Sequence, residues 1–380
     1  MAKEAIAPNE RLWAAIRLEK PDRVPVVPLL TPEPAAHLAG LTQAEVSNDS
    51  QRALAASFKV FDDYGGWDSV YGGTLTPVQY QATGMYPLKV RIPGKDLPDD
   101  YLFQICEEEV LKREDYNKIC ETGFRRFYYQ EYLWRITDLA PQDLPEVIKE
   151  VQTFGLRFRE ECHKRGVEMF IGAHGFHPFF HLSLMRSLVP FTQDLYFKPD
   201  PVERTLKQMT EELIAEQLPI AKASGINIWI LTEERSSCFY YPLWVFERFW
   251  WPYTQEIVDA FWSEGIVTVL HLDRTWDRNI PYFKKLPKGS AIIELDSTTD
   301  IFQAKEILAG HLCIHGDVPA TLLAIGKPEE VEAYCRRLID EVGRGGGFIL
   351  GTGCCVPPDC KPENFRTMIE TGKNYEPSRR

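Results

Sequence analysis

The sequence predicts an α/β protein built as a (β/α)8 TIM barrel. Short runs rich in β-branched residues alternate with amphipathic stretches, and about eight such runs can be counted. Strands that alternate with helices form a parallel sheet. The runs are apolar along nearly their whole length, which is typical of strands covered on both faces. A count of eight favours a closed barrel over an open sheet.

The first two expected strands lie in the less regular N-terminal part, at Arg23–Leu30 and Trp67–Tyr71. The six later runs are Val167–Ile171, Ile226–Leu231, Ile266–His271, Ala291–Leu295, Leu312–Gly316 and Gly347–Leu350. The expected helices are Gln51–Tyr64, Asp143–Lys164, Val202–Ser224, Trp244–Gly265 and Glu329–Val342.

Two segments alternate in character and are expected to form antiparallel strands outside the barrel, Pro87–Ile92 and Tyr101–Leu111. Because no linker, repeat or low-complexity tract interrupts the chain, residues 1–380 are expected to form one barrel domain with N-terminal extensions. The tail after Thr371 is expected to be a loose terminus.

Composition and charge exclude several classes of protein. The chain has 380 residues, of which 44% are hydrophobic and 26% charged, and its formal net charge is −12. Such acidity, with no basic stripe, argues against nucleic-acid binding. Neither a signal peptide nor an apolar run of the roughly 18 residues that a membrane helix needs is present, so the protein is expected to be cytoplasmic. Nine irregularly spaced cysteines do not form a disulfide framework, and we expect reduced thiols.

Polar groups follow six consecutive expected strands. In a βα barrel the active site lies at the C-terminal ends of the strands. The residues found there are His174, Glu233, Glu234, Arg235, His271, Asp273, Arg274, Asp296, Asp317, Cys354 and Cys355. One polar loop residue carries little information, but their recurrence in register predicts an active site.

The sharpest combination is His271, Asp273 and Cys354. Imidazole, carboxylate and thiolate are all zinc ligands, and an open fourth position makes such a site catalytic. Glu233 or Glu234 could complete the set. The alternative is that His271 and Asp273 are hydrogen-bonded residues of the barrel rim, or contact substrate without a metal, and that Cys354 is an inert thiol.

A second group comprises His174, His177 and His181 in the run HGFHPFFH. Their spacing allows a metal site, but Pro178 and the phenylalanines favour an aromatic pocket wall. His174 follows a strand directly and is expected to contact substrate.

One glycine-rich segment and one aromatic segment are further candidates for binding sites. Gly343–Gly347 precedes a strand, whereas phosphate loops follow one, so it is expected to be a helix stop and tight turn. The run Phe239–Tyr241 follows the Glu233 strand. Phe239 and Tyr240 are therefore candidates for the wall of a pocket that takes a flat apolar ligand.

Several segments resemble uroporphyrinogen decarboxylase-like proteins. They are ERLWAAIRLEKPDRVPVVP, HLDRTWDRNI, LPKGSAIIELDSTTDIFQAKEILAG, HLCIHGDVPATLLAIGKPEEV and GGGFILGTGCCVPPDCKPENFRTMIE, so the resemblance covers nearly the whole chain. It implies a single (β/α)8 barrel. The true decarboxylases carry an arginine-rich N-terminal stretch that grips the substrate carboxylates. Here that stretch is PLLTPEPAAHLAG, which has no arginine, and this departure argues against the decarboxylase.

The other branch of the superfamily consists of corrinoid-dependent methyltransferases. Coenzyme M methyltransferases resemble this chain in using His-x-Cys and a distant Cys as zinc ligands. His271 and Cys354 match two of these positions, and Asp273 replaces the first cysteine, which disfavours a thiol substrate. The resemblance therefore implies transfer of a methyl group from a methoxylated aromatic to cob(I)alamin on a corrinoid partner protein, as in O-demethylases of anaerobic bacteria.

The residues assigned to this reaction fall into three groups. Glu233, His271 and Asp273 are assigned to catalysis. His271, Asp273, Cys354 and Glu233 are assigned to a possible zinc. His174, Asp296, Phe239 and Tyr240 are assigned to substrate binding. The alternatives are a decarboxylase-like lyase, a transferase for methylamines, betaine or thiols, and a barrel that binds a corrinoid or tetrapyrrole without turnover.

Overall fold

A six-stranded parallel sheet forms most of the barrel wall. The structure is a computed structural model that describes residues 6–72 and 75–376. In sheet order the strands are β10 (Phe348–Thr352), β9 (Cys313–Val318), β8 (Ala291–Leu295), β7 (Val267–Leu272), β6 (Ile228–Glu233) and β5 (Ala173–Phe176). Each adjacent pair is parallel, as the alternation of strands and helices predicted.

Three short N-terminal or connecting segments join the two edges of this sheet. They are residues 25–30, β1 (Ser69–Val70) and β4 (Glu168–Met169), and β1 pairs with β4 in parallel. Backbone hydrogen bonds of 2.8–3.0 Å complete the circle: Val27 N to Leu350 O, Asp68 N to Val26 O, Phe170 N to Val70 O and Gly172 N to Ile228 O. Strands occur at seven of the eight predicted positions, although Val167–Ile171 is reduced to β4. The eighth, Arg23–Leu30, makes only isolated bridges at Val26 and Leu29, yet it closes the circle, and the barrel fold is confirmed.

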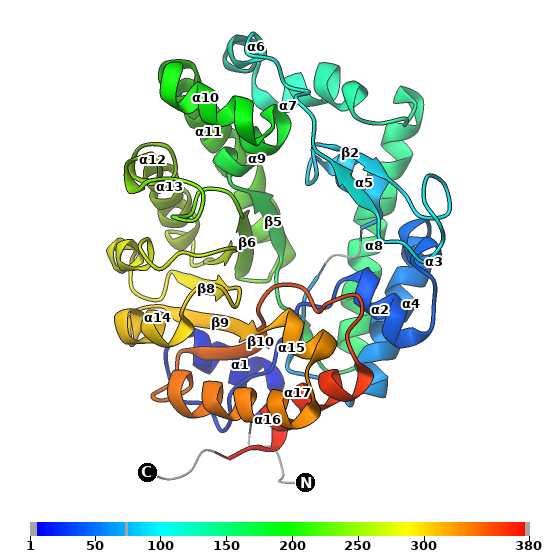
Figure 1. Cartoon of the computed structure of the whole chain (residues 1–380), viewed down its shortest axis with the longest axis vertical. Coiled ribbons are helices and arrows are strands. Elements are labelled where there is room, and N and C mark those ends of the chain that lie inside the picture. The colour runs from blue at the N-terminus through cyan, green and yellow to red at the C-terminus, as the bar shows by residue number, and fades with distance from the viewer. Residues whose placement is uncertain (1–5, 73–74, 377–380) are drawn as a thin grey trace.

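Helices surround the barrel and extend it on one side (Figure 1). In the N-terminal half they are α1 (Pro8–Ile16), α2 (Pro32–Ala39), α3 (Gln43–Ser47), α4 (Ser50–Asp63), α5 (Pro77–Thr83), α6 (Asp115–Thr122), α7 (Phe124–Phe127), α8 (Leu144–Lys164) and α9 (Pro178–Arg186). In the C-terminal half they are α10 (Leu188–Phe197), α11 (Pro199–Ser224), α12 (Leu243–Phe249), α13 (Trp251–Trp262), α14 (Ile301–Leu308), α15 (Ala320–Ile325), α16 (Pro328–Arg337) and α17 (Pro362–Asn374). None of the helices in the described ranges is both long and apolar enough to cross a membrane.

The N-terminal extension stands across the central opening from β5 and β6 (Figure 1). It contains the antiparallel pair β2 (Lys89–Arg91) and β3 (Gln104–Cys106), which confirms the expected excursion outside the barrel. Together with α5 and α8, this pair makes one wall of the opening.

Two sequence expectations about helices were wrong. The stretch Trp244–Gly265 is two helices, because Pro252 cannot donate a backbone hydrogen bond and its ring clashes with the preceding turn. The chain after Thr371 was expected to be a loose terminus, but its first residues are ordered; residues 377–380 lie outside the described part of the chain. Helix α17 continues to Asn374, and the Tyr375 hydroxyl donates to Asp340 at 2.8 Å.

The glycine-rich segment before β10 is a tight turn, as expected. Gly345, Gly346 and Gly347 all have positive φ. A Cβ atom on Gly346 would lie 2.3 Å from the Glu19 carbonyl oxygen, so only glycine fits where the turn meets the N-terminal region.

Side chains inside the barrel form an apolar lower part and a polar upper layer. The apolar part includes Val27, Ile228, Val267, Val269, Ile292 and Ile349. Side chains alternate between the two faces of a strand, so His271, Glu294 and His315 continue the inner face toward the C-terminal ends. This layer forms the base of the site described below.

A buried ion cluster fixes the closing strand. Asp68 is 1% exposed and accepts hydrogen bonds of 2.7 Å from Arg11 Nη1, Arg23 Nη1 and the Val26 amide. Because Asp68 also donates its own amide to Val26, one residue links β1, the segment 25–30 and helix α1.

The substitution Asp68→Ala is expected to lower the free energy of unfolding by about 3–5 kcal/mol, because it removes the buried carboxylate that Arg11, Arg23 and the Val26 amide share. Urea denaturation measures this change. Asp63→Ala is the control, since Asp63 is 47% exposed and pairs with Lys59, and a surface pair contributes less than about 1 kcal/mol. Equal effects of the two substitutions would contradict the role given to Asp68.

Candidate active site

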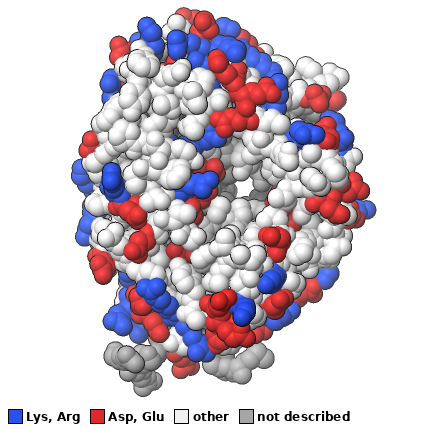
Figure 2. All heavy atoms as spheres, viewed as in Figure 1, with Lys and Arg blue, Asp and Glu red and all other residues white. Residues whose placement is uncertain are grey.

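A cavity of about 330 Å³ lies at the C-terminal ends of the strands, where barrel active sites occur. This volume is at the small end of the range for ligand pockets, about 300–1,000 Å³. Figure 2 shows a hollow at the centre of this face, with uncharged residues around much of its edge. The lining is largely apolar and aromatic, and its aromatic members are Tyr71, Tyr80, Tyr86, Phe154, Phe158 and Phe176.

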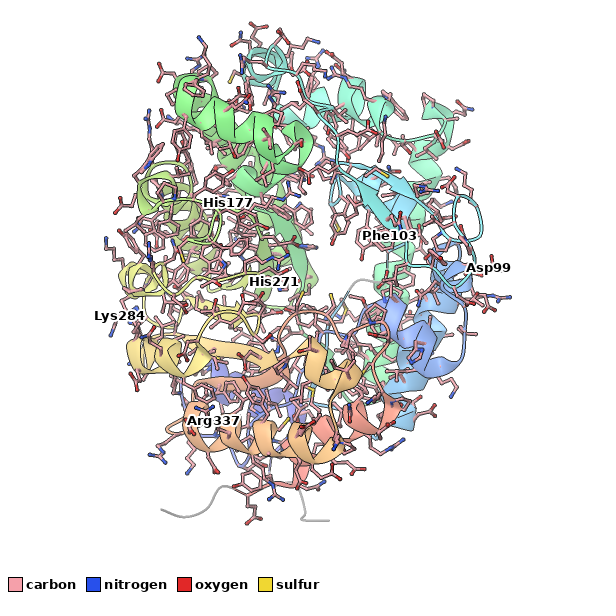
Figure 3. All side chains as sticks on the ribbon, in the orientation of Figure 1. Asp99, Phe103, His177, His271, Lys284 and Arg337 are labelled. Atoms are coloured by element: carbon pink, nitrogen blue, oxygen red, sulfur yellow. The ribbon has the colours of Figure 1, made fainter. Side chains whose placement is uncertain are left out.

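His271, Asp273 and Cys354 meet at the edge of this cavity, as the sequence predicted. His271 Nε2 lies 3.5 Å from Asp273 Oδ1 and 3.8 Å from Cys354 Sγ. Cys354 Sγ lies 3.6 Å from Asp273 Oδ2. Figure 3 shows His271 beside the central opening. One ligand atom from each side chain falls within 4.8 Å of the others, a spacing that a single metal ion can bridge.

The chemistry of these three groups fits zinc. Nitrogen, oxygen and sulfur donors are present together, and three protein ligands leave a fourth position open. The Asp273 Oδ1 atom is buried and has no hydrogen-bond partner among the described residues. A buried carboxylate oxygen without a partner is costly, and a cation between Asp273, His271 and Cys354 would satisfy it.

The ring of His271 is held from behind by Glu294. His271 Nδ1 donates to Glu294 Oε1 at 3.0 Å, so Nε2 points toward Asp273 and Cys354. Burial alone would lower the pKa of His271, but the carboxylates of Asp273 and Glu294 raise it well above its ordinary value. Burial raises the pKa of Asp273, partly offset by the charge of His271.

The loop that carries Cys354 is anchored to the closing strand. Leu29 and Cys355 form an isolated parallel bridge, and Val356 N donates to Leu29 O at 2.9 Å. Leu29 N in turn donates to Thr352 Oγ1 at 3.3 Å. Cys355 also lines the cavity. All nine cysteines are free thiols, in line with the expected absence of disulfides.

The structure places Glu234, and not Glu233, beside the cavity. Glu233 lies on the outer face of β6, the same face as Trp229 and Leu231, and it is not in the group that could hold a metal. Assigning Glu233 as a ligand and catalytic group was therefore wrong. Glu234 lines the cavity; its burial and the nearby Asp273 carboxylate raise its pKa to about 7.

Glu233 is instead buried between the sheet and the outer helices. Its Oε2 accepts from Trp250 Nε1 at 2.8 Å, and its Oε1 accepts from the Arg235 amide at 2.6 Å. Burial raises the pKa of Glu233 to about 8, although both hydrogen bonds act in the opposite direction. These contacts give Glu233 a structural role, in which it joins β6 to the outer helices.

The three histidines of the HGFHPFFH run do not converge. His174 lines the cavity, and its Nε2 lies 2.9 Å from Thr232 Oγ1. His177 is buried near Trp250, away from the opening, and its Nδ1 accepts from the Phe179 amide. His181 Nε2 donates to Gly84 O at 2.6 Å. The pocket position of His174 agrees with expectation, and among the described residues these histidines form no metal group.

Three residues assigned to substrate do not line the cavity. Asp296 holds loop backbone, because its carboxylate accepts from the Arg274 and Thr298 amides at 2.7 and 2.9 Å. Phe239 is 60% exposed beneath Arg274, with 5.7 Å between the guanidinium carbon and the ring centroid, and Tyr240 packs edge-on against it.

Sequence reasoning missed the actual aromatic wall and the partners of His271. Tyr71, Tyr80 and Tyr86 come from the irregular N-terminal part, where no pattern marks a pocket. Glu294 carried a signal that was available, since a lone charge inside the apolar run AIIEL needs a buried partner.

Comparison with known proteins places the chain in a family. Residues 140–375, more than half of the chain, match the family model described as uroporphyrinogen decarboxylase (URO-D). The chain belongs to the uroporphyrinogen decarboxylase family. This match begins just before helix α8 and covers β4 to α17, which includes every residue of the His271 group.

The relatives that the chain resembles are named for different activities. A uroporphyrinogen decarboxylase of Methylococcus capsulatus is 33% identical over 24% of this chain and 25% of its own length. The methylcobamide:CoM methyltransferase MtbA of Methanosarcina mazei is 28% identical over 34% of this chain and 37% of its own. The aligned regions thus span well under half of either relative. A solved structure titled methyltransferase from Methanosarcina mazei superposes with a TM-score of 0.71 at 17% identity, over 97% of this chain and 98% of that one, which supports the fold.

The raised pKa of Glu233 predicts a pH dependence of stability. Below pH 4.5, the ordinary carboxyl value, Glu233 is protonated in both states. Between pH 4.5 and about 8 only the unfolded chain releases the proton, so the free energy of unfolding falls as pH rises. At 1.36 kcal/mol per pKa unit, the fall amounts to at most about 5 kcal/mol.

The substitution Glu233→Gln is expected to remove this fall. Urea unfolding of the wild type and of Glu233→Gln from pH 4.5 to 8 gives the slope of the free energy of unfolding against pH for each protein. The difference between the two slopes is the measured quantity. Parallel pH profiles would show that Glu233 is ionised in the folded protein.

Proposed function

We propose that this protein is a corrinoid-dependent methyltransferase that takes a methyl group from a methoxylated aromatic. The methyl group passes to cob(I)alamin carried by a partner corrinoid protein. The observation that carries the proposal is the meeting of His271, Asp273 and Cys354 at the rim of an aromatic-lined cavity. The relatives support a methyltransferase, since two of them are named for methyl transfer involving a methylcobamide.

The cavity lining supports an aromatic donor. Six aromatic side chains surround a small space, and flat apolar rings pack favourably against such walls. Among the described residues, the lining holds no Lys or Arg. The site therefore lacks the cations that a polycarboxylate such as a tetrapyrrole needs, which disfavours the lyase.

His271, Asp273 and Cys354 are the residues that would hold a zinc ion. Bound zinc supplies Lewis acidity toward the ether oxygen of the donor. An oxygen ligand at position 273 suits an ether better than a thiol substrate, for which softer ligands are preferred. The aromatic walls orient the ring so that its methyl group faces the opening, where the partner arrives.

Glu234 is placed to supply the proton that the leaving group needs. Breaking the methyl–oxygen bond leaves the electron pair on the phenolate oxygen, which is a poor leaving group unless it is protonated. The Glu234 carboxyl, with its pKa raised to about 7, holds a proton near neutral pH. It can transfer this proton to the phenolate oxygen and yield the neutral phenol. Thr232 Oγ1 and His174 Nε2, hydrogen-bonded to each other, supply further polar contacts in the cavity.

The direct test mixes the protein with cob(I)alamin and guaiacol. The expected result is the spectrum of methylcobalamin with release of catechol. His271→Ala is expected to lower the rate by at least about 100-fold. Loss of a residue that only orients a metal ligand costs up to about 100-fold, and loss of the ligand itself should cost no less. His163→Ala is the control, because His163 lies on the surface of α8 and pairs with Glu168.

The outcomes separate the candidate functions. Carbon dioxide release from a carboxylated substrate would support the lyase. Formation of methylcobalamin only with methylamine, betaine or thiol donors would show that the donor is not aromatic. A bound chromophore without turnover would indicate a corrinoid- or tetrapyrrole-binding protein. Unchanged turnover in His271→Ala would contradict the assigned site.

The proton-donor role predicts a leaving-group effect. Glu234→Gln is expected to slow demethylation by about 10²–10⁴-fold for donors whose phenolate is a poor leaving group. Donors with electron-withdrawing substituents should be affected much less, because their phenolates need no proton. Rates across a series of substituted anisoles measure this. Glu233→Gln is the matched control, and an equal loss in both variants would contradict the placement of Glu234.

A further inference from the structure

Four buried side chains lie in contact inside the barrel, directly beneath the cavity, and hydrogen bonds join three of them. Glu294 from β8 is 1% exposed and lies at their centre. Around it stand His271 from β7, His315 from β9 and Tyr71, which follows β1. Glu294 and His315 have no part in the proposed reaction, and burying a carboxylate within a barrel is costly unless it is fully paired.

Both oxygens of Glu294 are occupied. Oε1 accepts from His271 Nδ1 at 3.0 Å. Oε2 accepts from the Tyr71 hydroxyl and lies 3.3 Å from His315 Nδ1. With partners on three sides, the carboxylate cannot rotate without breaking at least one of these contacts.

His315 is itself fixed to the closing strand. Its Nε2 donates to the Val27 carbonyl at 2.8 Å, and its ring stacks on Tyr71 with an interplanar angle of 14°. The neighbouring strand makes room for this ring with a glycine, since a Cβ atom on Gly351 would lie 2.2 Å from His315 Nε2. The barrel is thus shaped to hold His315 against Glu294.

The orientation of His271 follows from this arrangement. With Nδ1 donating to Glu294, the ring can present only Nε2 to Asp273 and Cys354. A metal ion needs the lone pair on Nε2, so the hydrogen bond to Glu294 selects both the ring direction and the tautomer that can bind.

We infer that Glu294, clamped by His315 and Tyr71, is a positioning residue that sets the affinity of the His271–Asp273–Cys354 group for a divalent cation of the zinc class. The inference rests on the metal site of the proposed function. It adds Glu294 and His315, which touch neither metal nor substrate, and it gives Tyr71, a member of the aromatic wall, a second role. An ordinary outer partner of a metal-bound histidine contributes about 10–100-fold in affinity.

The test measures Zn²⁺ affinity of the full chain by competition with a chromophoric chelator, together with the absorption spectrum of the Co²⁺ form. Glu294→Gln is expected to weaken Zn²⁺ binding by about 10–100-fold and to shift the Co²⁺ bands, because the amide no longer provides the charged acceptor. Tyr71→Phe, which removes one hydroxyl and preserves packing, is expected to weaken binding less and serves if Glu294→Gln does not fold. Glu233→Gln, a buried carboxylate of the neighbouring strand, is expected to leave affinity and spectrum unchanged.

The outcomes distinguish the inference from the function on which it rests. Wild-type affinity in both Glu294→Gln and Tyr71→Phe overturns the inference and leaves the metal site standing. A wild-type protein that binds no stoichiometric Zn²⁺ overturns the metal site and the inference together. Weakened binding in Glu233→Gln to the same degree also overturns it, since the effect would then belong to any buried carboxylate.

Discussion

Closure of the barrel by residues 25–30 is the constraint on which the site depends. This segment joins β10 to β1, and its backbone makes the contacts that place two parts of the site. Val27 O anchors the His315 ring, and Leu29 holds the loop that carries Cys354. His271 lies on β7, which β8 and β9 join to β10 within the main sheet, so the anchoring of the loop after β10 sets how near Cys354 comes to it. The Asp68 cluster, remote from any substrate, therefore bears on the chemistry.

Electrostatics divides the site into two levels. In the lower level, the His271 imidazole and the Tyr71 hydroxyl donate to the two oxygens of the Glu294 carboxylate, so this buried charge is paired within the barrel. The upper level gathers carboxylates and thiols without an equal number of cations. Among the described residues, Asp273 Oδ1 has no hydrogen-bond partner there. Because the carboxylates and thiols of the upper level outnumber its cations, this level favours binding of a metal ion or of a proton. The proposed reaction uses both, with zinc at Asp273 and a proton on Glu234.

The sequence was sufficient for the barrel and for the His271 group, but not for the phase of β6. Strand count and position follow from apolar runs, and strand ends locate the site. In the run IWILTE both faces are apolar, so nothing local tells whether Glu233 or Glu234 points inward; the packing of Trp250 decides it. Phe239 and Tyr240 were placed by their nearness to a strand end, whereas the real wall comes from residues far away in sequence. Such contacts depend on tertiary folding and leave no local pattern.

Half of the aromatic wall lies in a different part of the chain from the polar rim. Tyr71, Tyr80 and Tyr86 precede residue 140, where the family match begins, whereas His271, Asp273 and Cys354 all lie within it. Under the proposed function, three of the six rings that would contact the donor therefore lie outside the stretch that carries the His271 group. Substitutions in the N-terminal extension can reshape that part of the cavity while the His271 group stays intact.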